Sequence, residues 1–570
     1  MADFTYNDYE VILTAESDNS DVEFELPEIY EPNEDNTESA HVDEDNIESA
    51  NIEEDNIGST SGVERSPVFH WDSDPFLPQV HNFDSSFSGA KLCTDESMQE
   101  VDFFKIFIHQ KFVELIVTET NRQYKCIKNK SSSISYRMQQ WVDTTVDEIY
   151  IFLGLCILMA RNSRNTIEEH WSTDILLHSP IFSDVMPRNR FQILLGMLHF
   201  CNNEEQPPGD RLFKIKTIVD MITINFQEQM YPYMNVCIDE SLILFKGRLM
   251  FKQFIPTKAS RFGIKLFVIC DCATGYVLNF IVYTGATTIY TQHKELGISG
   301  SIVMTLMDPY LNRGHTLFVD NWYTSPLLFQ SLFDKKTNAC GTVRKNRKHM
   351  PKFKKKLKKG EIEAYHTDSM AAQVWKDKRD VAMLTTLHPS TLAETGKLHY
   401  ATNEPILKPE SINDYNKNMG AVDKCDMIVS SVHSSRKTMR WYKKIFFHLL
   451  DLCLLNAHVI YREKTGKRKA LAEFQLEVIR QLFYRHQQSS EPKAGSSRKR
   501  KSDLPSRLVD RHFIGKFPAT AQKQTATKRC VVCLAKKKRR ESRYMCKQCN
   551  VALCVEPCFE QYHSLENYNK

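Results

Sequence analysis

The chain has 570 residues, and its 42% hydrophobic content with 33 Phe predicts several folded domains rather than one simple core. The net charge of +3 hides an asymmetry, because the first 60 residues contain 20 Asp and Glu and no Lys or Arg, which leaves 74 basic against 51 acidic residues in the rest. A basic body favours a polyanionic partner such as nucleic acid, and no small-molecule substrate is indicated.

Membrane and secreted classes are disfavoured. The acidic start is unlike a signal peptide, and the longest apolar-rich run, residues 149–160, is too short to span a bilayer. The 16 cysteines do not form the framework of a small secreted domain, so we expect an intracellular protein in a reducing compartment.

Residues 1–95 carry an imperfect ten-residue acidic repeat, in which EDNTESA is followed by EDNIESA and EDNIGS. High net charge with few large apolar residues predicts a disordered region. Two roles are open for it: a plain tail, or a segment that screens or mimics the polyanionic partner.

A helical region follows over residues 96–230. Phe104, Phe107, Ile108 and Phe112 recur at three- and four-residue spacing, which is typical of a helix with one apolar face. Thr145 and Glu148 form the pattern of a capping box that opens the apolar run noted above.

From residue 231 the period changes to that of strands. Short β-branched segments at 236–239, 242–245, 263–271 and 276–283 predict a strand meander. A helix is expected over 301–311, a buried strand over 315–320, and a further helix begins at Thr324-Ser325-Pro326. Strands that alternate with helices indicate a mixed α/β domain.

Residues 344–413 interrupt this pattern with a basic segment, which has ten Lys or Arg between 344 and 360. It is either a solvated face or an inserted subdomain that contacts nucleic acid. Helical periodicity resumes from Asp426 and runs through 440–461, a polar linker covers 485–510, and a cysteine-rich tail ends the chain. SSRKRKSD at 496–503 resembles a nuclear localisation signal, so we expect a nuclear protein.

Four aspartates lie next to apolar elements. Asp239 and Asp320 each end a predicted strand, and Asp423 and Asp426 stand one helical turn apart behind Gly420. Helix capping would explain the last two. A bound cation would explain all four, because an ionised carboxylate is buried at a high free-energy cost unless it is paired or binds a metal. Oxygen ligands suit Mg²⁺ or Mn²⁺, and two such ions support phosphodiester displacement in DNA.

The tail carries a second cluster of ligands. Paired CxxC motifs followed by two cysteines and a histidine are strong evidence for zinc. The seven residues are Cys530, Cys533, Cys546, Cys549, Cys554, Cys558 and His563. Two tetrahedral sites need an eighth ligand, for which His512 is the nearest upstream choice. The alternation suggests a cross-brace in which Cys530 and Cys533 hold one Zn²⁺ and Cys546 and Cys549 the other, and the partners of each pair stay open.

Several stretches of the chain resemble motifs of the piggyBac transposases, in order from about residue 100 to the C-terminus. They are DESLILFKGR at 239–248, FVDNWYTS at 318–325, GTVRKNR at 341–347, GAVDKCD at 420–426 and SRKTMRW at 435–441. The resemblance implies an RNase H-like catalytic domain of the DDE/D type. Its catalytic, metal-binding acids match Asp239, Asp320 and Asp423, and a further functional aspartate matches Asp426.

The resemblance also divides the chain. It implies a helical dimerisation and DNA-binding domain (96–230 and 431–484), a catalytic domain (231–343 and 414–430), a basic insertion domain (344–413) and a cysteine-rich zinc domain (511–570). Members act as dimers on double-stranded DNA, form hairpin ends and insert at TTAA.

The expected DNA contacts are basic residues and one tryptophan: Arg344, Lys345, Arg347, Lys348, Arg436, Lys437, Arg440, Trp441, Lys536, Lys537, Lys538, Arg539 and Arg540. For Trp441, stacking on a flipped base and an ordinary core position are both open.

We therefore expect a metal-dependent transposase with Mg²⁺ or Mn²⁺ in its catalytic site and two structural Zn²⁺. The alternative is a host-adopted, transposase-derived DNA-binding protein with dormant catalysis. A scaffold or ubiquitin-ligase-like protein built around the zinc module fits less well, because a basic loop separates the ligand pairs. No phosphate loop, HExxH or GxSxG motif points to other chemistry.

Overall fold

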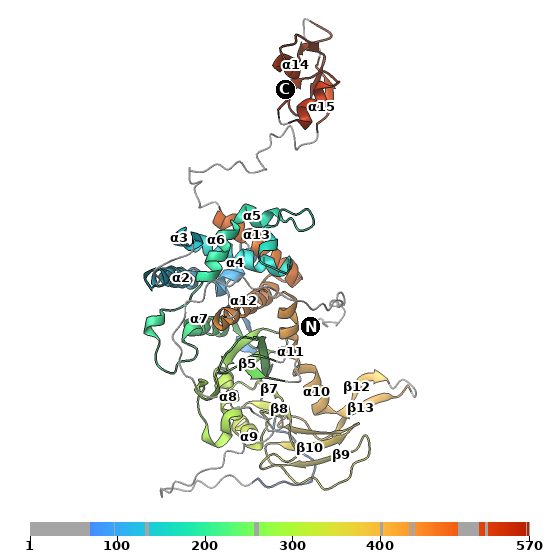
Figure 1. Ribbon diagram of the computed structural model, residues 1–570. Coiled ribbons are helices and arrows are strands. Elements are labelled where there is room, and N and C mark those ends of the chain that lie inside the picture. Colours follow the sequence, from blue (N-terminus) through green and yellow to red (C-terminus); the bar gives the residue numbers. More distant parts are fainter. Residues whose placement is uncertain are drawn as a thin grey trace. The chain divides into compact units, whose positions relative to one another are not determined.

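The computed structural model describes residues 69–95, 97–130, 136–255, 262–398, 403–432, 434, 438, 440–487, 512–518, 523–565 and 567–568. The chain divides into two compact units, Met1–Ser490 and Glu491–Lys570 (Figure 1). The acidic repeats, the predicted nuclear localisation signal, Arg436 and Lys437 lie outside the described residues.

A mixed sheet forms the centre of the first unit. Within it, β3 (Asn235–Leu244) pairs antiparallel with β5 (Phe262–Asp271) and parallel with β7 (Thr316–Val319). Outside these, β6 (Val277–Val282) pairs with β5, and β8 (Asn338–Thr342) pairs parallel with β7. The crossovers are α8 (Gly297–Met307) and α9 (Pro326–Asp334), whose N-cap is the predicted Ser325. The predicted mixed α/β domain is confirmed.

Two details of the strand prediction are wrong. The segments 236–239 and 242–245 are one continuous ten-residue strand, because β3 pairs with β5 along nearly its whole length. Asp239 therefore lies in the middle of β3 rather than at its end. What ends beside Asp239 is the neighbouring strand, since the β3–β7 ladder stops at the pair Ile238 and Val319.

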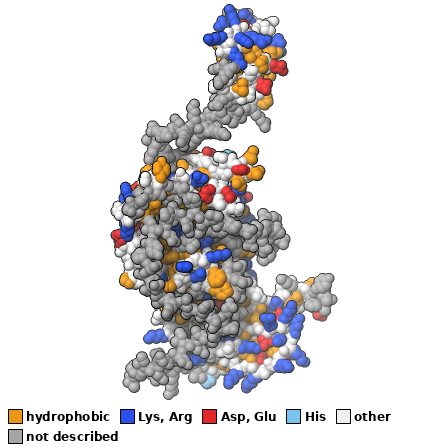
Figure 2. Space-filling model, viewed as in Figure 1, with side chains coloured by type: hydrophobic (Ala, Val, Ile, Leu, Met, Phe, Trp, Pro, Cys, Tyr) orange, Lys and Arg blue, Asp and Glu red, His pale blue; other side chains and the backbone are white. Residues whose placement is uncertain are grey.

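The basic insertion continues the central sheet. β11 (Asp380–Thr385) pairs with β8, and β10 (Ala371–Lys376) and β9 (Ile362–His366) follow in antiparallel order. β12 (Leu392–Leu398) and β13 (Pro405–Pro409) form a separate hairpin. Figure 2 shows Lys and Arg side chains gathered over this part of the molecule.

Helices from both ends of the first unit pack together beside the sheet. α1 (Glu100–Phe107) contacts α12 (Trp441–Thr465) and α13 (Leu471–Gln487), and α13 also packs along α4 (Val146–Arg161). The remaining helices of this group are α2 (Gln110–Lys130), α3 (Tyr136–Gln139), α5 (Pro180–Val185), α6 (Arg188–Met197) and α7 (Phe213–Gln229). At α4 only half of the predicted capping box forms, because Thr145 accepts from the Glu148 amide while the Glu148 carboxylate binds Thr144 and Arg190.

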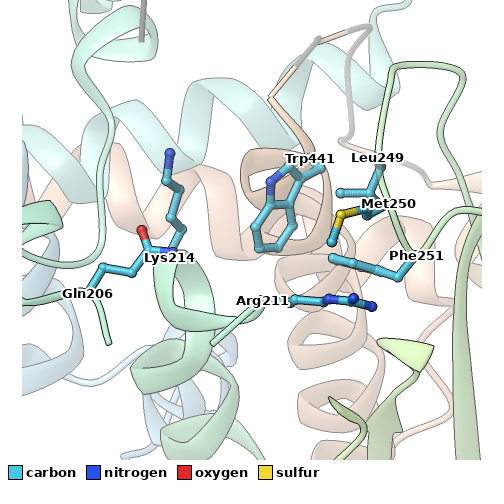
Figure 3. A pocket seen from close by; sticks show the side chains of 7 residues that line it. All are labelled: Gln206, Arg211, Lys214, Leu249, Met250, Phe251 and Trp441. Atoms are coloured by element: carbon cyan, nitrogen blue, oxygen red, sulfur yellow. The ribbon is translucent and has the colours of Figure 1, made fainter. Parts of the chain in front are cut away.

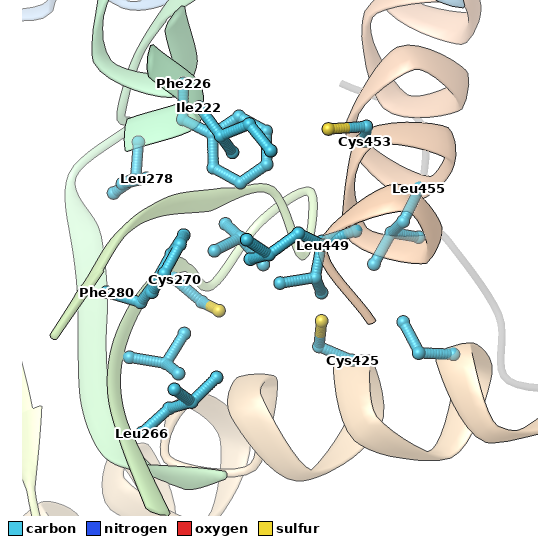
Figure 4. Packing of buried hydrophobic residues seen from close by; sticks show 14 of the residues in the cluster. Ile222, Phe226, Leu266, Cys270, Leu278, Phe280, Cys425, Leu449, Cys453 and Leu455 are labelled. Carbon is cyan, nitrogen blue, oxygen red and sulfur yellow. The ribbon is translucent and has the colours of Figure 1, made fainter. Parts of the chain in front are cut away.

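α12 is long and apolar enough to cross a membrane by length and composition, but 94% of its most apolar stretch is buried. It packs as a central core helix. Leu449, Cys453 and Leu455 of α12 belong to the same continuous apolar cluster as the sheet residues Leu266 and Cys270, and Leu449 points toward the sheet (Figure 4).

The N-terminal boundary predicted at residue 95 is too late. Residues 69–95 lie along the first unit and are held there by their own side chains. The acidic composition of the whole region gave no sign of these anchors. Phe76 is buried, Asp72 forms a β-bridge with His366, and Ala90 of β1 (Gly89–Ala90) donates its amide to Glu463 of α12. β1 also pairs with β2 (Met230–Tyr231).

The second unit is small, and cysteine side chains make up most of its core. It contains β14 (Ile514–Lys516), β15 (Lys528–Arg529), α14 (Val531–Ala535), β16 (Glu541–Ser542), β17 (Tyr544–Cys546), β18 (Val551–Ala552) and α15 (Cys558–Ser564). Six cysteines line its core with Val532 and Leu553. So few apolar side chains leave little hydrophobic burial, which is typical of a domain that depends on metal.

Candidate active site and metal centres

Asp239 on β3 and Asp320, which directly follows β7, are neighbours across two parallel strands. Ile238 is paired with Val319, and the next residue in each segment is an aspartate. Both side chains are half-buried. Two aspartates that are 81 residues apart in the chain thus lie side by side, although Asp239 is in the middle of its strand and not at the predicted strand end.

The turn after β7 fixes the position of Asp320. Its Oδ1 accepts from the amide of Trp322 at 2.9 Å, and its carbonyl accepts from the amide and hydroxyl of Thr324 at 3.1 and 2.8 Å. Gly341 on β8 packs against this turn so closely that a Cβ there would be 2.6 Å from the Val319 carbonyl. The backbone therefore leaves the carboxylate of Asp320 little freedom.

Asp423 and Asp426 lie on α11 (Ala421–Ser431), which packs against β3 and β5. The N-cap of α11 is Gly420, so neither aspartate caps the helix, although Asp423 lies in the first turn, where a carboxylate is favoured. Asp426 is half-buried and its Oδ1 accepts from the hydroxyl of Ser241 at 2.6 Å. Asp423 lies in the first turn and is exposed.

Several acidic side chains lie close together around Asp320. Burial, followed by the charge of Glu240, raises the pKa of Asp320 above its ordinary value. Burial also raises the pKa of the Tyr323 phenol, and the charges of Glu240, Asp239 and Asp320 raise it further. Burial is the larger cause of both shifts, and the smaller contribution from neighbouring carboxylates is the repulsion that a cation would relieve.

The residues present fit a hard divalent cation, since all of the donors are carboxylate oxygens. Within the described residues, sets of at least three ligand atoms within 4.8 Å of one another occur only in the C-terminal unit. The four aspartates of the first unit do not reach that spacing, so their side chains would have to move to share one ion.

Two of the predicted DNA-contacting arginines lie beside this site. Arg344 Nε approaches Asn321 Oδ1 at 3.5 Å, and Arg347 donates to the carbonyls of Asn321 and Trp322. Burial and the neighbouring Arg344 lower the pKa of Arg347. Lys345 is paired with Asp380 at 2.6 Å, and Lys348 is exposed.

Trp441 is the first residue of α12 and is half-buried at the edge of a pocket of about 190 Å³. Figure 3 shows its indole beside Met250 and Phe251, and the Phe251 ring meets it edge-on at 5.5 Å. Arg211 and Lys214 also line the pocket, so Trp441 is not an ordinary core aromatic. Arg440 next to it donates to the carbonyl of Gly196 at 3.2 Å.

Sequence reasoning missed three residues of the site. Ser241 holds Asp426, and Glu240 acts on Asp320 while binding Lys265 at 2.9 Å. The Lys265 ammonium also lies 4.9 Å from the Trp322 ring centre. Ser241 shares a strand face with Asp239 by the period of two, which could have identified it. No signal in the sequence marked Lys265.

The first ligand group of the C-terminal unit consists of Cys530, Cys533, Cys554 and Cys558, all buried. The Cys533 sulfur lies 3.5 Å from that of Cys558 and 3.9 Å from that of Cys554. Tetrahedral Zn²⁺ with Zn–S distances of about 2.3 Å places sulfurs about 3.8 Å apart. The spacing and the thiolate donors therefore fit zinc.

The second group consists of His512, Cys546, Cys549 and His563. His512 Nδ1 is 3.5 Å from the Cys546 sulfur and 3.4 Å from that of Cys549, and His563 Nε2 is 3.7 Å from Cys549. His563 Nδ1 lies 2.7 Å from the Phe559 carbonyl, an arrangement that turns Nε2 toward the sulfurs. The two groups interleave along the chain, as in the predicted cross-brace, and the structure places His512 where the eighth ligand is needed.

A basic surface covers the loop between the ligand pairs. Lys537, Lys538, Arg539 and Arg540 are exposed, and Lys536 is half-buried with its ammonium 3.1 Å from Gln561 Oε1. This places five cationic residues on the metal-binding unit itself.

Known proteins share both units. A family model described as "Transposase IS4" matches residues 99–458, and one described as "DDE_Tnp_1-like zinc finger" matches residues 511–564. PiggyBac transposable element-derived protein 3 of Homo sapiens is 26% identical over 479 residues, which cover 81% of this chain and 76% of that protein. PiggyBac transposable element-derived protein 2 of Homo sapiens is 26% identical over 415 residues, which cover 69% and 66%.

A solved structure has the same fold. It is the cryo-EM structure of the piggyBac transposase synaptic complex with hairpin DNA, with a TM-score of 0.62 and 23% identity over 82% of this chain and 97% of that one. The expected RNase H-like fold with flanking helices and a C-terminal zinc-binding region is confirmed. Because the "Transposase IS4" model covers more than half of its length, the chain belongs to the family of piggyBac-type transposases.

Proposed function

We propose that this protein cuts transposon ends and transfers them into target DNA in a reaction that requires a divalent metal ion. The observation that carries the proposal is the position of Asp320, directly after β7, next to Asp239 on the neighbouring strand β3, with α11 and its two aspartates packed against β3. Mg²⁺ or Mn²⁺ held by Asp239, Asp320, Asp423 and Asp426 would stabilise charge on the attacking and leaving oxygens.

The chain's own residues bind and orient the substrate. Arg344 and Arg347 are placed beside Asp320, where they would hold a phosphate near the metal-binding acids. Trp441, with Arg211 and Lys214 around the same pocket, offers an aromatic face for an extruded base and cations for its phosphates. Hairpin ends and TTAA targets, which the family resemblance implies, are part of the proposal.

The C-terminal unit would bind two Zn²⁺, one in each ligand group, and present Lys536 to Arg540 to DNA. The zinc ions would fix the loop that carries these residues and take no part in cleavage. A homodimer acting in the nucleus completes the proposed assembly.

The deciding experiment is excision from a plasmid that carries the repeats flanking the protein's own gene. Wild type should restore an uninterrupted plasmid, and Asp239→Asn should not. If wild type binds the repeats without excising them at any Mg²⁺ or Mn²⁺ concentration, the protein is a DNA-binding derivative with dormant catalysis.

A further inference from the structure

The N-terminal strap, residues 69–95, begins against the basic insertion. The indole of Trp71 donates to the carbonyl of His349 at 3.0 Å, and the Phe69 ring meets the His349 ring at 5.6 Å. Next to them, Asp72 and His366 exchange two backbone hydrogen bonds of 2.9 Å. The first described residue of the chain is therefore fixed to the middle of the basic segment 344–360.

That segment presents lysines in a fixed arrangement. Phe353 and Leu357 pack on the core, and the carboxylate of Glu363 accepts from the amides of Lys354 and Lys355 at 3.0 and 3.1 Å. The exposed side chains between and around these anchors are Lys352, Lys354, Lys355, Lys356, Lys358 and Lys359. Among the described residues, none of these six forms an ion pair.

The sequence that precedes Phe69 has the opposite charge. Residues 1–68 contain 21 Asp and Glu against one Arg, a net charge of −20, whereas residues 344–360 contain ten Lys and Arg and no acid. Asp55, the last acid of the repeats, is 14 residues from Phe69. A tether of this length would give the acidic segment an effective concentration in the millimolar range at the lysines.

We propose that residues 1–68 bind the lysine surface of residues 352–359 in the same chain and compete with DNA for it. The carboxylates of this segment offer the lysines the same kind of partner as phosphates, so the acidic segment acts as an internal inhibitor of DNA binding. The inference rests on the proposed function, because it takes DNA as the ligand that is displaced.

The test compares DNA affinity with and without the segment. The full chain and a variant lacking residues 1–68, which keeps the whole strap, are titrated with a labelled duplex of the transposon end by fluorescence anisotropy. We expect the shortened chain to bind about tenfold more tightly at 50 mM salt, and the two affinities to converge as salt rises and screens the internal contact.

Two controls distinguish docking of the acidic segment on the lysine surface from general repulsion between that segment and DNA. In the first, residues 1–68 are moved to the C-terminus, which keeps the net charge and the strap but detaches the acidic segment from its anchor beside His349; inhibition should fall. In the second, Lys354→Gln, Lys355→Gln and Lys356→Gln are introduced together into both the full chain and the chain without residues 1–68. The difference in DNA affinity between these two chains should then be smaller than in wild type. The matched variant changes Lys125, Lys128 and Lys130 on α2 instead, and should keep the full effect.

Equal affinity of the full and shortened chains at low salt would overturn the proposal, as would undiminished inhibition by the relocated segment. If neither chain binds DNA, the proposed function fails instead, so the two failures are distinguishable.

Discussion

The hydroxyl of Ser241 on β3 donates to Oδ1 of Asp426 on α11 at 2.6 Å, across 185 residues of sequence. Ser241 stands two residues after Asp239, so both project from the same face of the strand. This single bond therefore joins the helix that carries two of the proposed metal-binding acids to the strand that carries a third.

Ser241→Ala should weaken metal binding without unfolding the protein. With the hydroxyl gone, Asp426 loses a hydrogen bond that orients it, and removing a hydrogen bond to a metal ligand costs about 10- to 100-fold in metal affinity. We expect the Mg²⁺ concentration for half-maximal cleavage to rise by about tenfold. Ser430→Ala is the matched control, because Ser430 lies on the same helix and bonds only its own turn, at Met427. An unchanged Mg²⁺ dependence would contradict the role given to Ser241.

Asp320→Asn should abolish cleavage and leave DNA binding near normal, because a neutral amide replaces a metal-binding carboxylate while the turn after β7 stays intact. A loss of at least about a hundredfold in rate is expected. Asp334→Asn, a change of the same kind on the exposed end of α9, should have little effect. Normal cleavage by Asp320→Asn would refute the site.

The same variant should be more stable than wild type when metal is absent. Burial and Glu240 raise the pKa of Asp320, so the native state holds this proton more tightly than the unfolded state does. Stability then falls as pH rises from the ordinary value of 3.8 through the raised pKa, and at pH 7 the ionised group destabilises the fold. Thermal unfolding at pH 7 should show a higher Tm for Asp320→Asn without Mg²⁺, and a smaller rise on adding Mg²⁺. A Tm below that of wild type in metal-free buffer would contradict this.

How far the sequence predicts this site depends on how local each signal is. Asp239 and Asp320 follow apolar runs, and the alternation of strands and helices predicts their shared sheet. The register that pairs Ile238 with Val319 depends on the tertiary structure and not on local sequence. The same is true of the hydrogen bond from Ser241 to a residue 185 positions away. Phe69, Trp71 and Phe76 were too sparse among acids to predict the strap, because burial against the insertion, not local propensity, orders them.

In the zinc unit, too, the sequence predicts some features and only the folded chain determines the others. Counting ligands predicts two sites and an eighth residue at His512, but neighbouring CxxC pairs can be shared between two ions in more than one way. Only the folded chain brings Cys554 and Cys558 to Cys530 and Cys533, and His512 and His563 to Cys546 and Cys549.

Cys546→Ser should remove about one of two zinc ions per chain and weaken binding to the transposon end, since it breaks the group that holds β17 and α15 together. Zinc released by a thiol-reactive mercurial, measured with a colorimetric chelator, gives the stoichiometry. Cys93→Ser is the matched control, because Cys93 is exposed and lies in the other unit. Full zinc content in Cys546→Ser would refute the ligand assignment, and unchanged DNA affinity after loss of zinc would refute the role of the tail.

Glu100→Gln should destabilise the helical region in a pH-dependent way. Burial alone would raise the pKa of Glu100, but hydrogen bonds from Lys469 and Gln481 outweigh it and lower the pKa to about 2. Glu100 at the start of α1 thereby binds Lys469, which precedes α13, at 2.6 Å, and it also binds Gln481 within α13. We expect a loss of about 1–2 kcal/mol in the free energy of unfolding at pH 7, measured by urea denaturation.

The sign of the pH effect follows from the lowered pKa. The unfolded state takes up the proton first, near the ordinary value of 4.5, so the wild-type advantage is complete above that pH and shrinks as pH falls toward about 2. Glu477→Gln is the control, because its pair with Arg480 lies within one helix and Arg480 is 66% exposed, where such pairs contribute little. A Glu100→Gln defect of equal size at pH 7 and pH 3 would show that Glu100 stabilises α1 through packing rather than through its charge.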